Sequence, residues 1–350
     1  MSSIFSHSKL KTFDQCGWKF RLEYLDRLRL PDESIEIYVG HRVHESLEAV
    51  YRGLIERREP PLLDAVLADY HAAWDRHWHE AIYIVRAGMQ AATYRANGER
   101  FLRDYFSAHA PFDPATEYTV AVEHELRFPV DATRGWMMRC IMDRVVRRPD
   151  GVWEIHDYKT AASLPRQSEF DSDEGESTGR QLALYQMILQ SVHPDAVRVE
   201  LKWHYLAHNK VMTSTRTPER IAALHRSVLA AIERVEAAMA SPETLAPKES
   251  ALCAWCQYAG HCPAKKHIFQ VRQMPAEQRR ADFGVRLVDG YVLGMAAGSH
   301  GTAAETTYRQ RLLRYAEHHS VFVLEGTTKR ARIRGDVVVL EEVKGLDRRC

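Results

Sequence analysis

The chain has 350 residues and a formal net charge of +1 at pH 7, with 45% hydrophobic and 27% charged residues. These values are ordinary for a globular enzyme and exclude a polycation, so a nucleic-acid site would be a local patch. No apolar run reaches the roughly eighteen residues of a membrane helix, and the N-terminus lacks the segments of a secretion signal. We therefore expect a cytoplasmic protein without a membrane partner, whose cysteines stay reduced.

Helical periodicity dominates the first third of the sequence, which we assign to a helical region over residues 1–116. Apolar residues recur at helical spacing in four segments, at 7–28, 34–58, 61–80 and 82–108. The last segment interleaves arginines with aromatics, which suits a single nucleic-acid strand but is also typical of a solvated helix over a core. These residues are Arg86, Arg95, Arg100, Arg103, Tyr94 and Tyr105.

A meander of strands follows, and helices and strands alternate after it. Period-two alternation predicts three antiparallel strands, at 117–130, 136–147 and 152–158, with Gly135 and Gly151 in the turns. Beyond an acidic loop at 166–178 we expect a helix, a strand and a long helix, at 179–192, 196–207 and 217–240. This order of elements favours an α/β fold with a mixed central sheet flanked by helices.

The C-terminal part of the sequence differs from this core. We place the core, with a cysteine triplet at its end, at 117–270, and a small appendage at 275–350. Within the appendage the pattern predicts a helix near 303–318 and short strands at 320–325 and 330–342. Its role is open.

Two aspartates and a lysine lie at the ends of neighbouring predicted strands. Asp143 ends one strand, Asp157 ends the next, and Lys159 points to the same face as Asp157 because it lies two residues further on. Carboxylates of this kind bind Mg²⁺ or Mn²⁺, and an ammonium beside the metal can orient water or stabilise charge on a phosphorane. An isolated Asp-x-Lys is more often a surface ion pair, so further motifs are needed to support a metal site.

Four cysteines form a second candidate site. Cys16 is near the N-terminus, and Cys253, Cys256 and Cys262 follow as C-x2-C-x5-C. Four thiolates can hold either Zn²⁺ or an iron–sulfur cluster, and spacing alone does not decide between them. His261, beside the last cysteine, keeps a zinc site with a histidine ligand open.

Further motifs accompany these residues. Gly40 and His44 lie near the start of a predicted helix, and Gln181 and Tyr185 share one face of another, preceded by Arg180. With the opening S-x-S-x-L-x-x-F-x-x-C, the segment Ile141-Met142-Asp143-Arg144 and the segment Asp157-Tyr158-Lys159, they make about residues 5–265 resemble the RecB/AddB-type nucleases of the PD-(D/E)XK superfamily. The likeness is to the iron–sulfur branch, which includes CRISPR-associated and phage-encoded exonucleases. The chain departs from the family pattern at Cys140, where a glycine is usual.

The resemblance implies a PD-(D/E)XK core, a [4Fe–4S] cluster and a divalent metal site. The cluster ligands would be Cys16, Cys253, Cys256 and Cys262, which would clasp the two ends of the core together. The implied metal ligands are His44, Asp143 and Asp157, and the family pattern favours Glu123 over Glu125 as a further carboxylate. Lys159 would act on water, and Gln181, Tyr185 and Arg180 would contact DNA.

These motifs lead to a functional hypothesis and two alternatives. We expect a Mg²⁺- or Mn²⁺-dependent DNA exonuclease that acts on single strands or ends in recombination, repair, phage DNA metabolism or CRISPR adaptation. Its partners would be DNA and proteins of recombination, helicase or CRISPR-adaptation complexes. The alternatives are a DNA-end-binding scaffold without turnover and a zinc-stabilised restriction-type endonuclease.

Overall fold

The computed structural model describes residues 3–264, apart from 58, 60, 87–88, 111, 114–117 and 174–177, and four strands beyond them. The chain forms two compact units. The first comprises Met1–Phe20, Glu36–Trp78 and Tyr94–Leu245, and the second comprises Arg21–Ile35, His79–Thr93 and Ala246–Cys350. The helix expected near 303–318 and the strand expected at 320–325 lie outside the described residues.

The first unit is built on a six-stranded mixed sheet with the order β1-β5-β6-β7-β8, in which β4 also pairs with β5. Its strands are β1 (Ser3–Phe5), β4 (Tyr118–Asp131), β5 (Trp136–Arg147), β6 (Trp153–Lys159), β7 (Val199–Tyr205) and β8 (Lys210–Ser214). The β1–β5 and β6–β7 pairs are parallel, and the other pairs are antiparallel. The predicted mixed central sheet is therefore confirmed.

Both faces of the central strand β6 are buried in the core. Residues 153–158 are all buried, so this strand lacks the buried–exposed alternation of a strand with one face in water. Side chains at even positions, such as Tyr158, face one layer of helices, and those at odd positions, such as Asp157, face the other. Asp157 and Lys159 therefore share one face at the end of β6.

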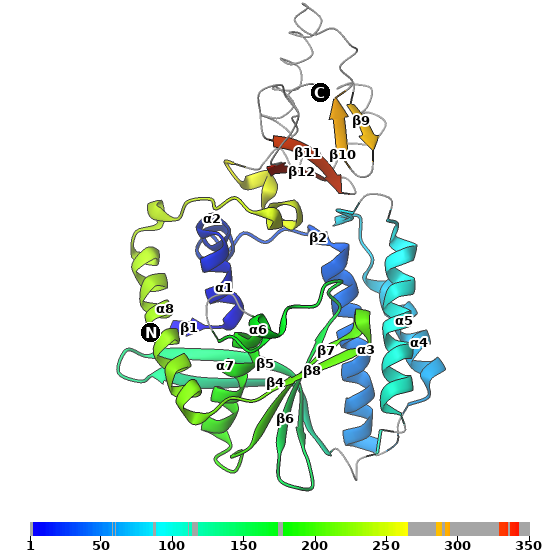
Figure 1. Cartoon of the computed structure of the whole chain (residues 1–350), viewed down its shortest axis with the longest axis vertical. Helices are drawn as coiled ribbons and strands as arrows, with labels where there is room; N and C mark the ends of the chain where they lie inside the picture. The colour runs from blue at the N-terminus through cyan, green and yellow to red at the C-terminus, as the bar shows by residue number, and fades with distance from the viewer. Residues whose placement is uncertain are drawn as a thin grey trace, which may run out of the picture. The chain divides into compact units, whose positions relative to one another are not determined.

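Helices cover the two faces of this sheet (Figure 1). On one side lie α3 (Ile35–Arg57), α4 (Leu63–His77) and α5 (Ala91–His109), and on the other lie α7 (Thr178–Val192) and α8 (Pro218–Ala240), with α1 (His7–Gln15) packed against α8. The long helix α8 begins where the sequence provides a start signal, since the Thr217 side chain accepts the N–H of Arg220 and Pro218 occupies the first turn.

Most predicted elements are confirmed to within a few residues, but two predictions are wrong and one strand was missed. The helix expected over 7–28 is broken at Cys16 into α1, α2 (Gly17–Phe20) and a π-helical turn (Arg21–Leu25). The described residues among 82–90 are not helical, and Ile82–Tyr83 pairs as β3 with β2 (Glu33–Ser34). The strand β8 was not predicted, and it pairs antiparallel with β7 at the edge of the sheet.

The second unit combines short turns with a small antiparallel sheet. Its four strands, in the order β12-β11-β10-β9, are β9 (Val285–Val288), β10 (Tyr291–Gly294), β11 (Lys329–Arg334) and β12 (Val337–Glu342). The hairpin of β11 and β12 lies where a strand was expected at 330–342. Elsewhere in the unit, Val85, Ala254 and Ala259 form a small apolar cluster, and the Tyr83 hydroxyl donates to the Trp255 carbonyl at 2.8 Å.

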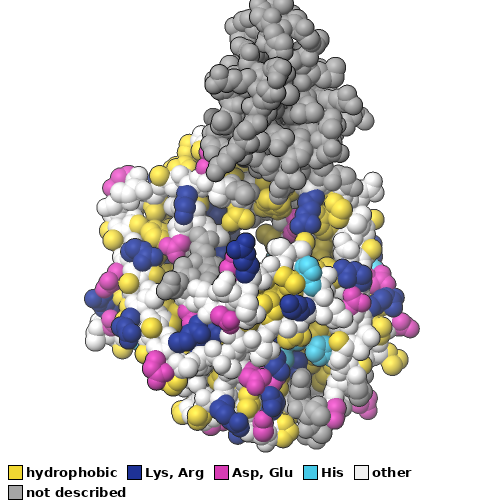
Figure 2. All heavy atoms as spheres, viewed as in Figure 1, with side chains coloured by type: hydrophobic (Ala, Val, Ile, Leu, Met, Phe, Trp, Pro, Cys, Tyr) yellow, Lys and Arg dark blue, Asp and Glu magenta, His cyan; other side chains and the backbone are white. Residues whose placement is uncertain are grey.

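Two surface properties of the described residues bear on function. None of the described helices is both long and apolar enough to cross a membrane. On the face drawn in Figure 2, cationic and anionic side chains are interspersed over the coloured part of the chain, without a large area of one sign. A long-range field over this face therefore contributes little to binding a polyanion, and local groups must do so.

Candidate active site

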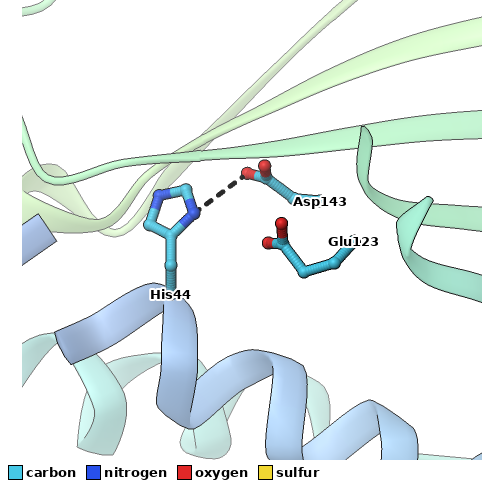
Figure 3. A group of neighbouring side chains, drawn as sticks. All are labelled: His44, Glu123 and Asp143. Carbon is cyan, nitrogen blue, oxygen red and sulfur yellow. Dashed lines mark ion pairs between the residues drawn. The ribbon is translucent and has the colours of Figure 1, made fainter. Parts of the chain in front are cut away.

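Three side chains from three elements of the first unit converge on one point (Figure 3). His44 comes from α3, Glu123 from β4 and Asp143 from β5, and one possible ligand atom of each lies within 4.8 Å of the other two. Among the described residues, no other set of histidines, cysteines and carboxylates meets this criterion. The sequence named all three residues as metal ligands, and the fold brings them together.

His44 presents a nitrogen lone pair to this point. Its Nε2 lies 2.7 Å from the carbonyl oxygen of Tyr158, which can only accept, so Nε2 carries the hydrogen. Burial lowers the pKa of the imidazole, which keeps the ring neutral and leaves Nδ1 unprotonated. Nδ1 lies 3.4 Å from Asp143 Oδ2, on the side where a metal would be bound. A backbone carbonyl that orients a histidine in this way is typical of metal sites.

The two carboxyl groups resist ionisation when no cation is present. Burial, and then the charge of Asp157, raises the pKa of Asp143 to about 8, although its Oδ2 accepts the Tyr158 N–H at 2.8 Å. Burial, and then the charge of Asp143, raises the pKa of Glu123 to about 7. A divalent cation would remove this repulsion, and a donor set of carboxylate oxygens with one imidazole suits Mn²⁺ or Mg²⁺. The residues present therefore fit the expected metal.

The backbone at Glu123 is strained. Its φ is +45°, in the left-handed region that side chains with a Cβ seldom adopt. It interrupts the β4–β5 ladder between the pairs Val122–Arg144 and His124–Met142, directly opposite Asp143. Such strain costs on the order of 1–3 kcal/mol and is concentrated at functional sites. Glu125, the alternative carboxylate, instead pairs with Arg127 and Arg139 at the surface.

Asp157 and Lys159 form an ion pair that Gln181 organises. Lys159 Nζ lies 2.5 Å from Asp157 Oδ2 and donates to Gln181 Oε1 at 3.1 Å. Gln181 Nε2 donates to Asp157 Oδ1 at 3.0 Å and to the Tyr185 hydroxyl at 2.9 Å. Only this orientation of the amide fits, because the opposite one would face its NH₂ group to an ammonium and its oxygen to a carboxylate.

Asp157 was expected in the same ligand set as His44, Asp143 and Glu123, but it is not a member of the close group. It lies near Asp143, whose pKa its charge raises, and is 2% exposed. Of the three residues named for DNA contact, Gln181 touches both Asp157 and Lys159. Tyr185 and Arg180 are 8% and 4% exposed, so both side chains lie in the interior.

Sequence reasoning missed the backbone of Tyr158 and the side chain of His7. The N–H of Tyr158 donates to Asp143, and its carbonyl oxygen accepts from His44. A pattern of residue types does not predict such main-chain contacts. His7, at the start of α1, is half-buried. Desolvation, and then the positive charges of Lys11, Arg180 and Lys159, lower its pKa to about 3. Its place beside the Ser6 cap in the opening motif was an available signal.

The arginine–aromatic pattern of the fourth helix belongs to a solvated helix over a core. Tyr94 and Tyr105 are buried inside the first unit. Arg95, Arg100 and Arg103 pair with neighbouring carboxylates, as in the Arg95–Asp75 ion pair at 2.9 Å and the Arg100–Asp104 ion pair at 3.0 Å. Arg86 lies outside α5 (Ala91–His109).

Comparison with known proteins assigns the chain to a family. Residues 4–263 match the model of the PD-(D/E)XK nuclease superfamily. The chain belongs to this superfamily. A solved structure from Eubacterium rectale, described as a "putative exonuclease", matches with 14% identity over 74% of this chain and 87% of that one, at a TM-score of 0.40. The search of curated proteins found no significant match.

Membership in the PD-(D/E)XK nucleases accounts for the geometry at the end of β6. Nucleases of this superfamily use divalent metal ions, and the group His44–Glu123–Asp143 offers a site for one. Asp143 and the Asp157-Tyr158-Lys159 segment, the residues expected from the resemblance to carry the aspartate and the D-x-K motif, both lie within the matched residues. The chain is therefore a nuclease by its superfamily, and the group His44–Glu123–Asp143 is its candidate metal site.

The candidate cluster cysteines of this nuclease occur in both units. In the first unit, Cys16 is the C-cap of α1, and its N–H donates to the Thr12 carbonyl. Its Sγ accepts the Lys19 N–H at 3.5 Å. In the second unit, Cys253, Cys256 and Cys262 lie in or beside two 3₁₀ turns, Ala251–Trp255 and Ala259–His261. Cys253 Sγ accepts the N–H of Ser250 at 3.4 Å. All four thiols are half-buried, whereas Cys140 is buried in the sheet.

Proposed function

We propose that this PD-(D/E)XK nuclease is a Mg²⁺- or Mn²⁺-dependent exonuclease that hydrolyses DNA from ends or along single strands. One observation carries the proposal: a neutral histidine and two carboxyls with raised pKa values converge beside an aspartate–lysine pair. Hydrolysis of a phosphodiester needs a cation on the phosphate and a group that acts on water. This arrangement supplies both at the end of one sheet.

The residues then take distinct roles in the reaction. His44, Glu123 and Asp143 would hold the cation, which when bound polarises the phosphate and acidifies a water. Lys159 orients the attacking water and stabilises the negative charge that develops on phosphorus. Gln181 keeps the ammonium of Lys159 in place through its Oε1. The water gives up a proton as its oxygen attacks phosphorus in line, the P–O3′ bond breaks, and the O3′ atom takes up a proton, so that the product retains a 5′-phosphate.

The proposal is tested with end-labelled linear DNA, single- and double-stranded, beside closed circular DNA. We expect wild-type protein to shorten the linear substrates in Mg²⁺ or Mn²⁺, to leave circles intact and to stop in EDTA. Lys159→Met should lose about 10³-fold in rate while it still binds DNA, because it keeps the length of the side chain but not its charge.

Other outcomes of the same assay would favour the alternatives. Cleavage of the closed circle would identify an endonuclease of the restriction type. Equal and metal-insensitive behaviour of wild type and Lys159→Met, with DNA binding retained in both, would identify a scaffold without turnover.

The four half-buried cysteines support a further part of the proposal, a [4Fe–4S] cluster held by Cys16, Cys253, Cys256 and Cys262. Backbone N–H donors to Cys16 and Cys253 would stabilise thiolates, as ligands of a cluster require. The cluster would clasp the two ends of the core, and its role would be structural, since hydrolysis transfers no electron.

Protein purified without oxygen should be brown and contain about four irons and four sulfides per chain. Cys256→Ala should lose most of the iron, and Cys140→Ala, a change at a buried cysteine outside the set, should retain it. Colourless protein with one zinc per chain would indicate that the cysteines hold a zinc ion and not a cluster.

The setting of the activity follows as part of the proposal. The resemblance to iron–sulfur nucleases supports a role in DNA recombination, repair, phage DNA metabolism or CRISPR adaptation. Helicase, recombination or CRISPR-adaptation proteins would then be partners, and residues 275–350 would form an appendage to the nuclease.

A further inference from the structure

Two residues next to the site in sequence, Arg144 and Tyr158, point to the opposite face of the sheet, into the core. Arg144 follows Asp143 on β5, and Tyr158 lies between Asp157 and Lys159 on β6. Because side chains alternate along a strand, both point away from the ion pair of Asp157 and Lys159. They are 1% and 3% exposed, respectively, in the layer between the sheet and the helices α3 and α5.

In that layer the two residues are joined by a hydrogen-bonded chain of tyrosines. Arg144 Nη1 donates to the Tyr51 hydroxyl at 3.0 Å, and this hydroxyl lies 2.6 Å from that of Tyr105. The Tyr105 hydroxyl lies 3.1 Å from the Tyr158 hydroxyl. The Arg144 guanidinium also lies 3.9 Å from the centre of the Tyr51 ring, and its Nε donates to the Thr119 hydroxyl at 3.0 Å. We call Arg144, Tyr51, Tyr105 and Tyr158 the tyrosine chain.

The tyrosine chain reaches the elements that carry two of the metal donors. Tyr51 is seven residues after His44 on α3, which places both side chains on the same face of that helix. Tyr158 holds His44 through its carbonyl and Asp143 through its N–H. Arg144 adjoins Asp143 on β5. A displacement of one hydroxyl would therefore shift α3 relative to β5 and β6, and with it the distance between His44 and Asp143.

The tyrosine chain is buried, so water cannot easily replace a missing hydrogen-bond partner. Tyr105 is 2% exposed, and its ring also packs edge-on against those of Tyr51 and Tyr158. Burial raises the pKa values of the Tyr105 and Tyr158 hydroxyls, so both stay protonated at neutral pH and can donate. Loss of a hydroxyl leaves a buried polar group without its partner, which a buried network tolerates poorly.

We propose that the tyrosine chain is a positioning network that sets the metal affinity of the site by fixing His44 against Asp143. This inference rests on the proposed metal-dependent function. None of its four side chains touches the reacting atoms. A change in the tyrosine chain is therefore expected to alter metal binding. DNA binding should not change, because the tyrosine chain is buried away from the surface.

The test compares two substitutions of buried tyrosines by phenylalanine. Tyr105→Phe removes the middle hydroxyl of the tyrosine chain. Tyr70→Phe is the matched control, because the Tyr70 hydroxyl is buried and donates to the Arg95 carbonyl at 3.0 Å, away from the chain. Mn²⁺ binding is measured by calorimetry on the whole protein without DNA, with thermal unfolding of the metal-free form and DNA binding on the same samples.

Tyr105→Phe is expected to weaken Mn²⁺ binding about tenfold, the lower range for groups that orient metal ligands, with DNA affinity unchanged. Tyr70→Phe should bind Mn²⁺ within about twofold of wild type even if both variants unfold at a lower temperature. Tyr51→Phe serves as a second variant if Tyr105→Phe does not fold, because it keeps the ring against Arg144 and loses only the hydroxyl.

Two results would overturn the inference. One is wild-type Mn²⁺ affinity in folded Tyr105→Phe or Tyr51→Phe, and the other is an equal loss in Tyr70→Phe, which would indicate general loosening of the fold. Wild-type protein that binds no Mn²⁺ would instead overturn the proposed metal site itself, so the two failures are distinguishable.

Discussion

Asp143→Asn is expected to abolish metal-dependent cleavage and, at the same time, to stabilise the metal-free protein. The substitution removes a charged donor from the group with His44 and Glu123, which should lower the rate by about 10³-fold or more. Its amide oxygen can take the place of Asp143 Oδ2 and still accept the Tyr158 N–H. The local fold therefore has no reason to change.

The gain in stability follows from the raised pKa of Asp143. Folding raises this pKa from 3.8 to about 8, so between these values the folded protein holds a proton that the unfolded chain has released. The stability of the metal-free protein consequently falls as the pH rises through this window, and the asparagine variant is spared this loss. The difference in melting temperature between variant and wild type should grow from pH 5 to pH 8.

Thermal unfolding in EDTA and in Mn²⁺ at several pH values checks this prediction. Mn²⁺ should raise the melting temperature of wild type most strongly near pH 8 and that of Asp143→Asn little. Asp131→Asn is the control, because hydrogen bonds from Thr133 lower the pKa of Asp131 and the change should destabilise the protein slightly. A metal-free Asp143→Asn protein that is less stable than wild type at pH 8 would contradict the account of the site.

Gly179→Ala is expected to be the most destabilising small substitution in the first unit, by about 3 kcal/mol or more. A Cβ on Gly179, in the first turn of α7, would overlap the carbonyl oxygens of Phe170 and Ser172 and lie 2.7 Å from Arg216 Nη2. These atoms cannot move aside easily. Arg216 donates to the Phe170 carbonyl at 3.2 Å and pairs with Asp173 at 2.5 Å.

The matched control is Gly40→Ala, the same change in another helix. The nearest atom to a Cβ on Gly40 is the Thr160 hydroxyl oxygen at 3.5 Å, an ordinary contact. Alanine there should stabilise α3 by about 0.5–1 kcal/mol. Urea unfolding of both variants measures the difference. A Gly179→Ala protein within about 0.5 kcal/mol of wild type would mean that the loop at Phe170–Ser172 yields freely.

The sequence by itself determined the elements whose signal is local. Period-two alternation located β4, β5 and β6, and helical periodicity located α8, because these patterns depend on which face of one element is buried. It also named Asp143 and the Asp157–Lys159 pair from their residue types and spacing, and the resemblance to a known family added His44 and Glu123. The family match over residues 4–263 confirms the superfamily.

Only the tertiary structure decided how these residues are oriented. The tautomer of His44 depends on a carbonyl 114 residues away in sequence, and the left-handed backbone of Glu123 depends on the strand opposite. The same holds for the amide of Gln181 and for the tyrosine chain, which joins four elements behind the site. Local periodicity records the burial of each element, whereas hydrogen bonds between distant elements form only once the sheet and its helices have packed.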